Sequence, residues 1–193
     1  MHLFFIYKKD LEKAGTVCLN GEARFMGPYD IVIDEKKKTS AGKFLIATGG
    51  VPNIAGITGA KETDFLTPAT ALRLEDLPEA IMVVGAGSSG CEIAEYFAEF
   101  GSKVVLAEAE NRILPREDTE VSQVMEQYFV KRLGIKVLTK TRVTKMEKEE
   151  NETVVTFNRD GEEKVVKVEA VVLATGCVPA THGLGLKDAG VSF

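Results

Sequence analysis

The sequence predicts an α/β protein in which a domain built on a parallel β-sheet is inserted into a second domain. Residues 81–108, IMVVGAGSSGCEIAEYFAEFGSKVVLAE, show the strand–glycine turn–helix–strand pattern of a Rossmann-like βαβ unit. The hexapeptides ATGGVP at 47–52 and ATGCVP at 174–179 begin 127 residues apart and enclose that unit. This enclosure is typical of an inserted domain whose entry and exit segments lie close together.

The composition is that of a globular protein and excludes several classes of function. The 193 residues include 45% hydrophobic and 27% charged residues, and the net charge of −5 gives no electrostatic basis for binding nucleic acid. The apolar run at residues 2–7 is far shorter than the roughly 20 residues of a membrane span, and it lacks a signal-peptide cleavage site. We therefore expect neither nucleic acid nor a membrane as a partner.

Each glycine of the glycine-rich turn has a role that is expected of a phosphate-binding turn. Gly85 allows the chain to turn sharply out of the strand, Gly87 allows phosphates to approach the backbone, and Gly90 allows the helix to pack closely on the strand. The free N–H groups of the first helical turn, which includes Ser88 and Ser89, then face the phosphates. We expect these five residues to bind the cofactor.

The sequence around the turn supports this interpretation over a chance cluster of glycines. The helix places Ile93, Ala94, Phe97 and Ala98 on one apolar face. Gly101 stands where a glycine commonly ends a helix. An isolated glycine pattern would be weak, but strand, helix and second strand are all present in the expected order.

An acid at the end of the second strand indicates which dinucleotide binds. Glu108 follows Gly90 by 18 residues, close to the offset of roughly 20 residues for the acid that binds the adenosine ribose. A carboxylate there accepts hydrogen bonds from the 2′-hydroxyl and repels a 2′-phosphate, which favours NAD over NADP. Arg112 and Arg116 lie downstream and keep NADP open as the alternative.

The segments before the βαβ unit are predicted to be a small β-meander, a strand and a short helix. Residues 16–34 alternate in polarity and break at glycines, which predicts the meander, and residues 35–38 are predicted to be a solvated turn or strand edge. The apolar run before the first ATG predicts a strand over 43–47. Thr67 is expected to cap a helix that extends to Leu74.

The segments after the βαβ unit are predicted to complete the sheet. Apolar residues between 121 and 133 recur with helical spacing, and residues 135–138 are predicted to form a third parallel strand. Three strands are then expected to form an antiparallel excursion with Asp160–Gly161 as a hairpin turn, over 143–148, 154–158 and 165–168. Residues 171–174 are predicted to return to the sheet.

Several further segments occur in the order in which one enzyme family has them. They are 20–25 (NGEARF), 47–49 (ATG), 85–92 (GAGSSGCE), Glu108, 112–115 (RILP), Asp118, Glu120, 174–176 (ATG), 183–186 (GLGL) and 189–191 (AGV). The chain thereby resembles the two-dinucleotide-binding-domain flavoproteins, or pyridine nucleotide-disulfide oxidoreductases. Its pattern is most similar to the dihydrolipoamide dehydrogenase type, with mercuric reductases and NADH oxidases near it.

The resemblance implies that the chain is the central part of a longer enzyme. In this family an N-terminal glycine motif for FAD and a redox cysteine pair precede the NAD domain, and neither occurs before Gly85. The family's flavin-binding Gly-Asp motif and its dimerisation domain are expected after residue 193. We therefore expect residues 1–52 to end the first FAD-domain segment, 53–172 to form the NAD-binding domain and 173–193 to begin the returning FAD-domain segment.

The resemblance also assigns roles to individual residues. Glu92 occupies the place of an acid that extends toward the nicotinamide and the flavin edge, although a first-turn acid is also favoured by the helix dipole. Gly176 and Val143 are expected to line the NAD site. The family's backbone contacts to FAD are expected at three positions, Ala23, Thr48 and Gly49.

The three cysteines form no redox pair in the sequence. Cys18, Cys91 and Cys177 are far apart, and the missing CxxC motif argues against the smaller thioredoxin reductases. Cys91 lies in the first helical turn, where a thiolate would be stabilised, but a small packed residue is the interpretation we favour. Without a structural disulfide pattern or an export signal, we expect a reducing cytoplasm.

Two classes of function remain. In the first, the chain is the NAD-binding part of an FAD-dependent oxidoreductase, in which NADH reduces FAD and FAD reduces a disulfide or similar acceptor. Such an enzyme would serve cell redox homeostasis, and the full-length form is expected to be a homodimer. The chain alone would then be inactive, with no catalytic residue or metal site of its own. In the second class, the chain is a stand-alone, non-catalytic NAD-binding module.

Overall fold

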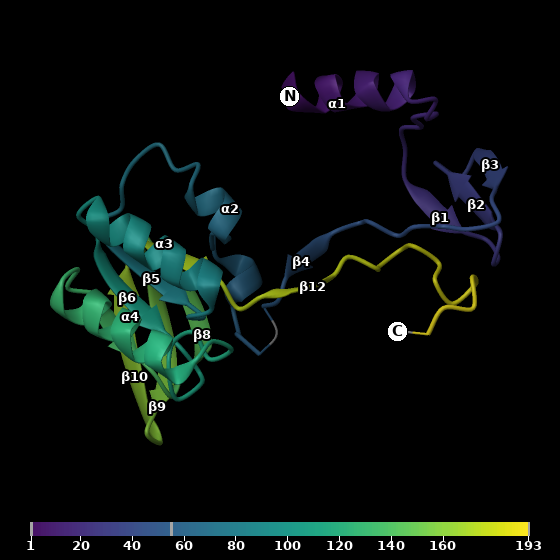
Figure 1. Ribbon diagram of the computed structural model, residues 1–193. Coiled ribbons are helices and arrows are strands. Elements are labelled where there is room, and N and C mark those ends of the chain that lie inside the picture. Colours follow the sequence, from purple (N-terminus) through teal and green to yellow (C-terminus); the bar gives the residue numbers. More distant parts are fainter. Residues whose placement is uncertain (1, 55, 193) are drawn as a thin grey trace. The chain divides into compact units, whose positions relative to one another are not determined.

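The computed structural model describes residues 2–54 and 56–192 and divides them into two compact units (Figure 1). The inserted unit is Gly50–Val178, and the outer unit comprises Met1–Gly49 and Pro179–Phe193. Within the described ranges, no helix combines the length and the apolar character that crossing a membrane requires.

A four-stranded parallel sheet forms the centre of the inserted unit, in the order β11-β5-β6-β7. The strands are Ala80–Val84 (β5), Lys103–Ala107 (β6), Lys136–Leu138 (β7) and Ala170–Leu173 (β11). Each neighbouring pair is parallel. The predicted α/β fold, its third parallel strand and its returning strand are therefore confirmed.

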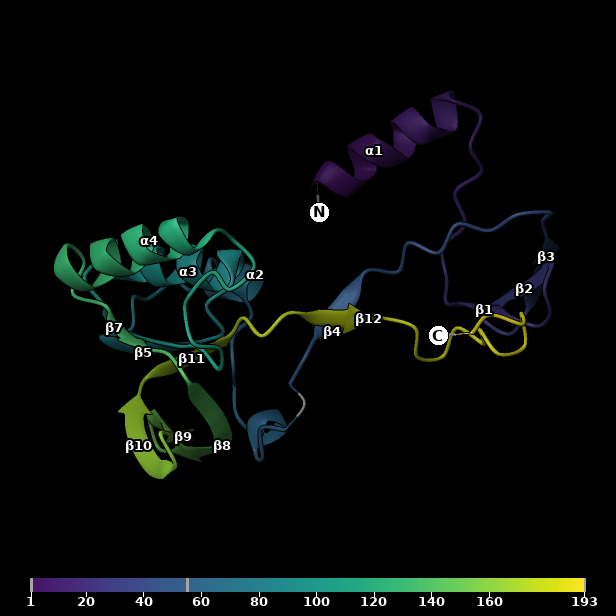
Figure 2. The same cartoon turned by 60° about the horizontal axis from the view of Figure 1, so that its bottom comes forward.

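Two helices cover one face of this sheet and an antiparallel sheet lies against the other (Figure 2). The helices are α3 (Ser88–Glu99) and α4 (Thr119–Lys131). The antiparallel strands are β8 (Thr141–Glu149), β9 (Glu152–Arg159) and β10 (Glu162–Val168). The predicted hairpin turn is confirmed: Asp160 and Gly161 have φ values of 54° and 82°, as a two-residue turn between twisted strands requires.

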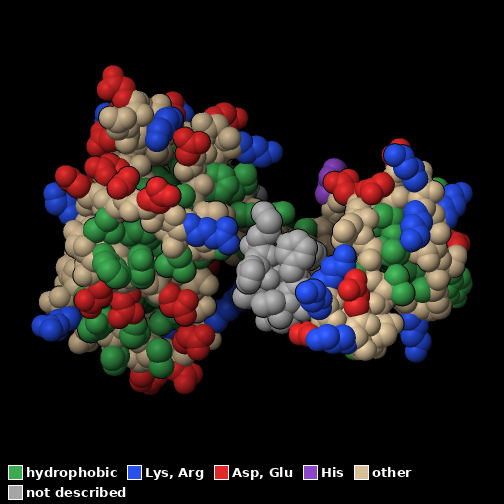
Figure 3. Space-filling view, turned by 90° about the horizontal axis from the view of Figure 1, so that it is seen from above, with side chains coloured by type: hydrophobic (Ala, Val, Ile, Leu, Met, Phe, Trp, Pro, Cys, Tyr) green, Lys and Arg blue, Asp and Glu red, His purple; other side chains and the backbone are tan. Residues whose placement is uncertain are grey.

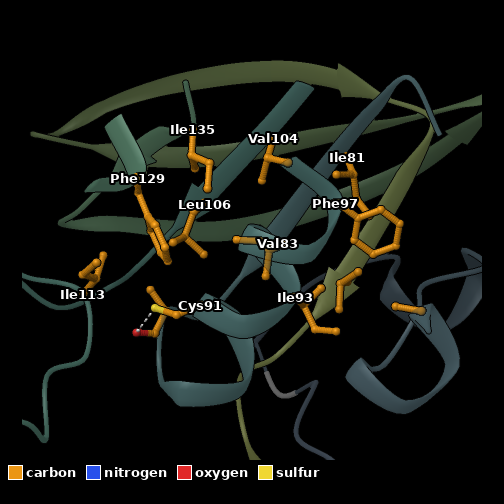
Figure 4. Packing of buried hydrophobic residues seen from close by; sticks show 14 residues of the cluster. Ile81, Val83, Cys91, Ile93, Phe97, Val104, Leu106, Ile113, Phe129 and Ile135 are labelled. Carbon is orange, nitrogen blue, oxygen red and sulfur yellow. Dashed lines mark hydrogen bonds between the residues drawn. The ribbon is translucent and has the colours of Figure 1, made fainter. Parts of the chain in front are cut away.

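The alternation of side chains along β5 explains why its sequence is apolar without interruption. Ile81 and Val83 pack into the helix-side core, whereas Met82 and Val84 pack into the core beneath the antiparallel sheet. A strand covered on both faces has no position for a polar residue. The helix-side core combines Phe97 of α3 and Phe129 of α4 with side chains from the sheet (Figure 4).

Short elements connect the sheet to the ends of the inserted unit. They are β4 (Gly50–Pro52), the 3₁₀-helix η1 (Ala60–Glu62), α2 (Pro68–Ala71) and β12 (Cys177–Pro179). Thr67 caps α2 as predicted, through a reciprocal pair of bonds with Thr70, but the helix ends at Ala71 and not at the predicted Leu74. Strand β4 pairs with β12, so the segments that directly follow the two ATG sequences lie side by side, as expected for the entry and exit of an inserted domain.

The outer unit contains a β-meander whose first two strands lie within the predicted residues 16–34 and whose third lies beyond them, and it contains a helix that was not predicted. Its strands β1 (Ala23–Phe25), β2 (Asp30–Ile33) and β3 (Lys37–Ser40) pair antiparallel in that order. The additional helix, α1 (His2–Lys13), includes the apolar residues near the N-terminus. An ion pair from Lys8 to Glu12 spans one helical turn at 3.9 Å.

The predicted strand over residues 43–47 is wrong. These residues have no regular structure, and Leu45 is 93% exposed. A strand needs a hydrogen-bonding neighbour, and none of the described strands pairs with this segment. Phe44 instead stacks edge-on against Phe25 of β1, with ring centroids 4.9 Å apart.

Candidate functional site

A cavity of about 830 Å³ lies in the inserted unit at the C-terminal edge of the parallel sheet. Val84, Ala107 and Leu173, the last residues of β5, β6 and β11, line it. Open α/β sheets bind their ligands at this edge, and the volume falls within the range of small-molecule sites.

Each glycine of the turn after β5 is needed for a different physical reason. Gly85 has a φ of 97°, and a Cβ there would lie 2.6 Å from the carbonyl oxygen of Ala174. A Cβ on Gly90 would collide with the carbonyl oxygen of Gly85, so this glycine lets α3 pack against the strand end. Gly87 has no atom within 4 Å of its Cβ direction and lines the cavity. Its bare backbone is therefore open to a ligand.

The N-terminus of α3 is directed at the same cavity. Gly87 precedes the helix, and the first helical bond runs from the Cys91 N–H to the Gly87 carbonyl oxygen at 3.0 Å. Backbone N–H groups before that bond have no partner within the helix. Ser88 and Ser89 are exposed and line the cavity. Such a helix end attracts anions through its N–H groups and its dipole.

Glu108 lines the cavity but is largely buried, with 8% of its surface exposed. Its Oε2 accepts a hydrogen bond from the Ala86 N–H at 2.7 Å, and its Oε1 accepts one from the Glu110 N–H at 3.0 Å. A carboxylate has about four acceptor positions, so capacity remains for a ribose hydroxyl. The bond to Ala86 was not predicted, because it joins residues 22 positions apart in the sequence.

Cys91 is a buried neutral thiol, as the favoured interpretation of the sequence held. Its Sγ donates to the Ala86 carbonyl oxygen at 3.5 Å (Figure 4). Burial, and to a smaller extent the nearby Glu108 carboxylate, raise the pKa of this thiol from 9.0 to about 12. The position at the helix N-terminus therefore does not produce a reactive thiolate.

The arginines near the cavity differ in whether their side chains are free to contact a ligand. Arg112 donates to the Thr119 hydroxyl at 3.2 Å and to the Pro115 carbonyl oxygen at 2.9 Å, which ties it to its own loop. Arg116 and Arg142 are exposed and line the cavity. Arg142 was not among the predicted site residues, although its neighbour Val143 on β8 was expected there from the family resemblance.

The structure brings together most of the residues predicted to bind NAD. Those lining the cavity are Gly85, Gly87, Ser88, Ser89, Glu108, Val143 and Gly176. Gly90 is buried behind the turn, and Glu92 is exposed on α3 without lining the cavity. Thr175 is a lining residue that was not predicted, and its hydroxyl donates to the Asn53 carbonyl oxygen at 2.5 Å.

The residues predicted to contact FAD lie in the outer unit. Ala23 begins β1, and Gly49 has a φ of 73°. The Thr48 hydroxyl donates to the Ala180 carbonyl oxygen at 2.9 Å, and the Ala180 N–H donates to the Gly49 carbonyl oxygen at 3.0 Å. These bonds join the two chain segments of the outer unit.

Comparison with known proteins agrees with this geometry. The family model described as pyridine nucleotide-disulphide oxidoreductase matches residues 6–193. The chain belongs to this family. The resemblance inferred from the sequence motifs is thereby confirmed, and the family's cofactors are FAD and NAD(P).

Relatives in this family include two kinds of enzyme. The mercuric reductase of Staphylococcus aureus is 32% identical over 181 residues, which are 94% of this chain and 33% of the relative. The dihydrolipoyl dehydrogenase of Mycobacterium leprae is 32% identical over 156 residues, which are 81% of this chain and 33% of the relative. The chain thus spans about a third of the length of these curated relatives.

One solved structure has the same fold as this chain. The HOCl-induced flavoprotein disulfide reductase RclA of Escherichia coli is 27% identical, with a TM-score of 0.81. The match covers 98% of this chain and 43% of that one. The match therefore extends over both units of this oxidoreductase-family chain.

Proposed function

We propose that this chain is the NAD-binding part of an FAD-dependent pyridine nucleotide-disulfide oxidoreductase of the dihydrolipoamide dehydrogenase type. The observation that carries the proposal is the convergence of the glycine turn and the ribose-type acid on one cavity. Gly87 opens its backbone to that cavity, α3 directs its N-terminus at it, and Glu108 lies on its wall. These are the groups that a dinucleotide requires.

The residues present fit NAD at this site. The amides beside Gly87, Ser88 and Ser89 would hold the pyrophosphate, because they are unpaired within the helix and lie where a Cβ-free backbone leaves space. Glu108 would accept a hydrogen bond from the adenosine ribose, and Val143 would contact the adenine. Gly176, whose Cβ direction is also open, would line the nicotinamide end.

The chain's contribution to the reaction is to bind the dinucleotide and to orient its nicotinamide. When both cofactors are bound, NADH supplies a hydride and FAD accepts it. Glu92, exposed in the first turn of α3, is proposed to face the reacting ends of the cofactors. The cavity walls hold the nicotinamide at one end by fixing the adenosine and pyrophosphate at the other.

The outer unit is proposed to belong to the flavin-binding domain. Residues 1–52 would end its first segment, 53–172 would form the NAD-binding domain, and 173–193 would begin the returning segment. Ala23, Thr48 and Gly49 would contribute contacts to FAD. The full-length enzyme would be a homodimer in the cytoplasm, with this chain joined to the remainder of the flavoenzyme.

The closed cores of the inserted unit also suit a second function, that of a stand-alone NAD-binding module. A flavin test examines whether this chain retains FAD or oxidises NADH by itself. The purified chain is mixed with FAD and freed of excess, its visible spectrum is recorded, and NADH oxidation is then assayed with lipoamide. We expect neither flavin retention nor activity from this chain alone. A stoichiometric yellow complex or steady NADH oxidation would contradict our view that this chain alone is inactive.

The proposed function is tested by calorimetric titration of the purified chain with NADH and with NADPH. We expect NADH to bind more tightly, because a 2′-phosphate would approach the Glu108 carboxylate. Equal or tighter binding of NADPH would refute the assignment of NAD. Absence of binding by either dinucleotide would refute the proposed site itself.

A further inference from the structure

The Ala86 peptide lies in the centre of the phosphate turn and is held from both sides. Its N–H donates to Glu108 Oε2 at 2.7 Å, and its carbonyl oxygen accepts from the Leu114 N–H at 2.7 Å. Cys91 Sγ also donates to that carbonyl oxygen at 3.5 Å. Ala86 itself is 0% exposed. Water therefore cannot replace these partners without opening the turn.

The two partners of Ala86 at 2.7 Å come from one segment, the one between β6 and α4. Glu108 follows β6, and Leu114 lies in the loop that leads to α4. Leu114 has a φ of 46°, an uncommon conformation for a branched side chain. The bond from its N–H to Ala86 is thus made by a backbone that departs from its preferred geometry.

We propose that Glu108 is a positioning residue for the pyrophosphate turn as well as a group that reads the adenosine ribose. By fixing the Ala86 N–H, its carboxylate sets the direction in which the following amides of Gly87 and Ser88 face the cavity. Its second oxygen is anchored by the Glu110 N–H at 3.0 Å, so the carboxylate cannot swing away from the turn. This inference rests on the proposed function, because it requires the turn to bind phosphates.

The positioning role and the ribose role predict different changes in affinity for ligands that lack the 2′-hydroxyl. If Glu108 only read the ribose, its removal would leave 2′-deoxyADP binding unchanged and would improve NADPH binding by removing a repulsive charge. If Glu108 also positions the turn, its removal weakens every ligand whose phosphates lie there. Whether the loss of Glu108 strengthens or weakens the binding of NADPH therefore distinguishes the two roles.

The experiment compares Glu108→Gln with the wild-type chain by calorimetric titration of ADP, 2′-deoxyADP and NADPH. Glutamine keeps the size of the side chain, but its amide group opposes one of the two backbone N–H donors. We expect all three ligands to bind about tenfold more weakly, the usual effect of losing a charge-assisted hydrogen bond. Unchanged 2′-deoxyADP binding or tighter NADPH binding would overturn the inference.

Glu110→Gln is the matched control. It removes one negative charge from the wall of the same cavity, and the hydrogen bond that Glu110 gives to Glu108 comes from its backbone, which the substitution keeps. We expect this variant to bind the anionic ligands as well as the wild type or better. A loss equal to that of Glu108→Gln would show that the effect does not depend on the bond between the Ala86 N–H and the Glu108 carboxylate, and it would overturn the inference.

A measurement on the wild-type chain keeps the test independent of the variants' folding. Amide hydrogen exchange without ligand should be slower at Ala86 than at Gly87 and Ser88, because only the first is bonded to a buried carboxylate. Exchange at Ala86 as fast as at its neighbours would overturn the inference. If the wild-type chain bound no ADP at all, the proposed function would fail, whereas wild-type binding with an unaffected variant defeats the inference alone.

Discussion

The inserted unit and the outer unit bury their apolar residues to very different extents. The inserted unit encloses two cores on the two faces of its parallel sheet, and Phe97, Phe129 and Val155 in them are at most 1% exposed. The outer unit buries a handful of side chains around Phe25, while Val17 and Leu45 are 80% and 93% exposed. Hydrophobic side chains are visible on the surface of both units in Figure 3.

This difference indicates that the two units depend on their surroundings to different degrees. A sheet covered on both faces supplies its own stability through burial. A three-stranded meander of short strands has little apolar area to bury and is marginal without a covering element. The inserted unit should therefore behave as an independent folding unit, and the outer unit should not.

The largest expected effect is in amide hydrogen exchange of the whole chain. Core amides in β5 and β6 should open only with global unfolding of the inserted unit, whereas amides in β1–β3 should open locally. We expect the exchange rates of the two groups to differ by at least about a hundredfold. Similar protection in both units would show that the outer unit is as stable as the inserted one.

Core substitutions should show the same contrast in the free energy of unfolding. Phe129→Ala removes a ring that is fully buried between α4 and the sheet and should destabilise the inserted unit by about 3–5 kcal/mol. Leu45→Ala, at an exposed position of the outer unit, should change stability by less than about 0.5 kcal/mol. Denaturant titration measures both, and a comparable loss from the two substitutions would contradict the contrast in burial.

A smaller effect is expected from the pH dependence of the buried thiol. Folding raises the pKa of Cys91 to about 12 from 9.0. The folded state therefore favours the neutral thiol, and that contribution is complete below about pH 9 and is lost as the pH rises toward 12. Cys91→Ala should reduce the fall in the free energy of unfolding across this window. Denaturant titration across this window measures the effect, and an unchanged pH dependence in Cys91→Ala would contradict it.

Patterns that depend on local sequence were predicted well. The uninterrupted apolar run of β5, the helical spacing of α4 and the Asp160–Gly161 turn each specify their structure within a few residues. The strand over 43–47 was wrong for the opposite reason. An apolar run becomes a strand only where another strand forms hydrogen bonds with it. The local sequence does not predict whether such a neighbouring strand is present.

The candidate site could be predicted only in part for the same reason. Gly85 and Gly90 are required by contacts that the motif itself implies, and Glu108 was found from its offset along the chain. The bond from Glu108 to the Ala86 N–H and the presence of Arg142 on the cavity wall depend on the packing of β8 and β6 around the turn. Neither has a sequence pattern of its own.

The central claim is that a dinucleotide binds at the C-terminal edge of the parallel sheet of the inserted unit. The most direct measurement is an NMR titration of the isotopically labelled chain with NADH, which follows each backbone amide. We expect the largest shifts at Gly87, Ser88, Ser89 and Gly176, with little change in β1–β3 of the outer unit. Shifts confined to the outer unit, or none at saturating NADH, would contradict the claim.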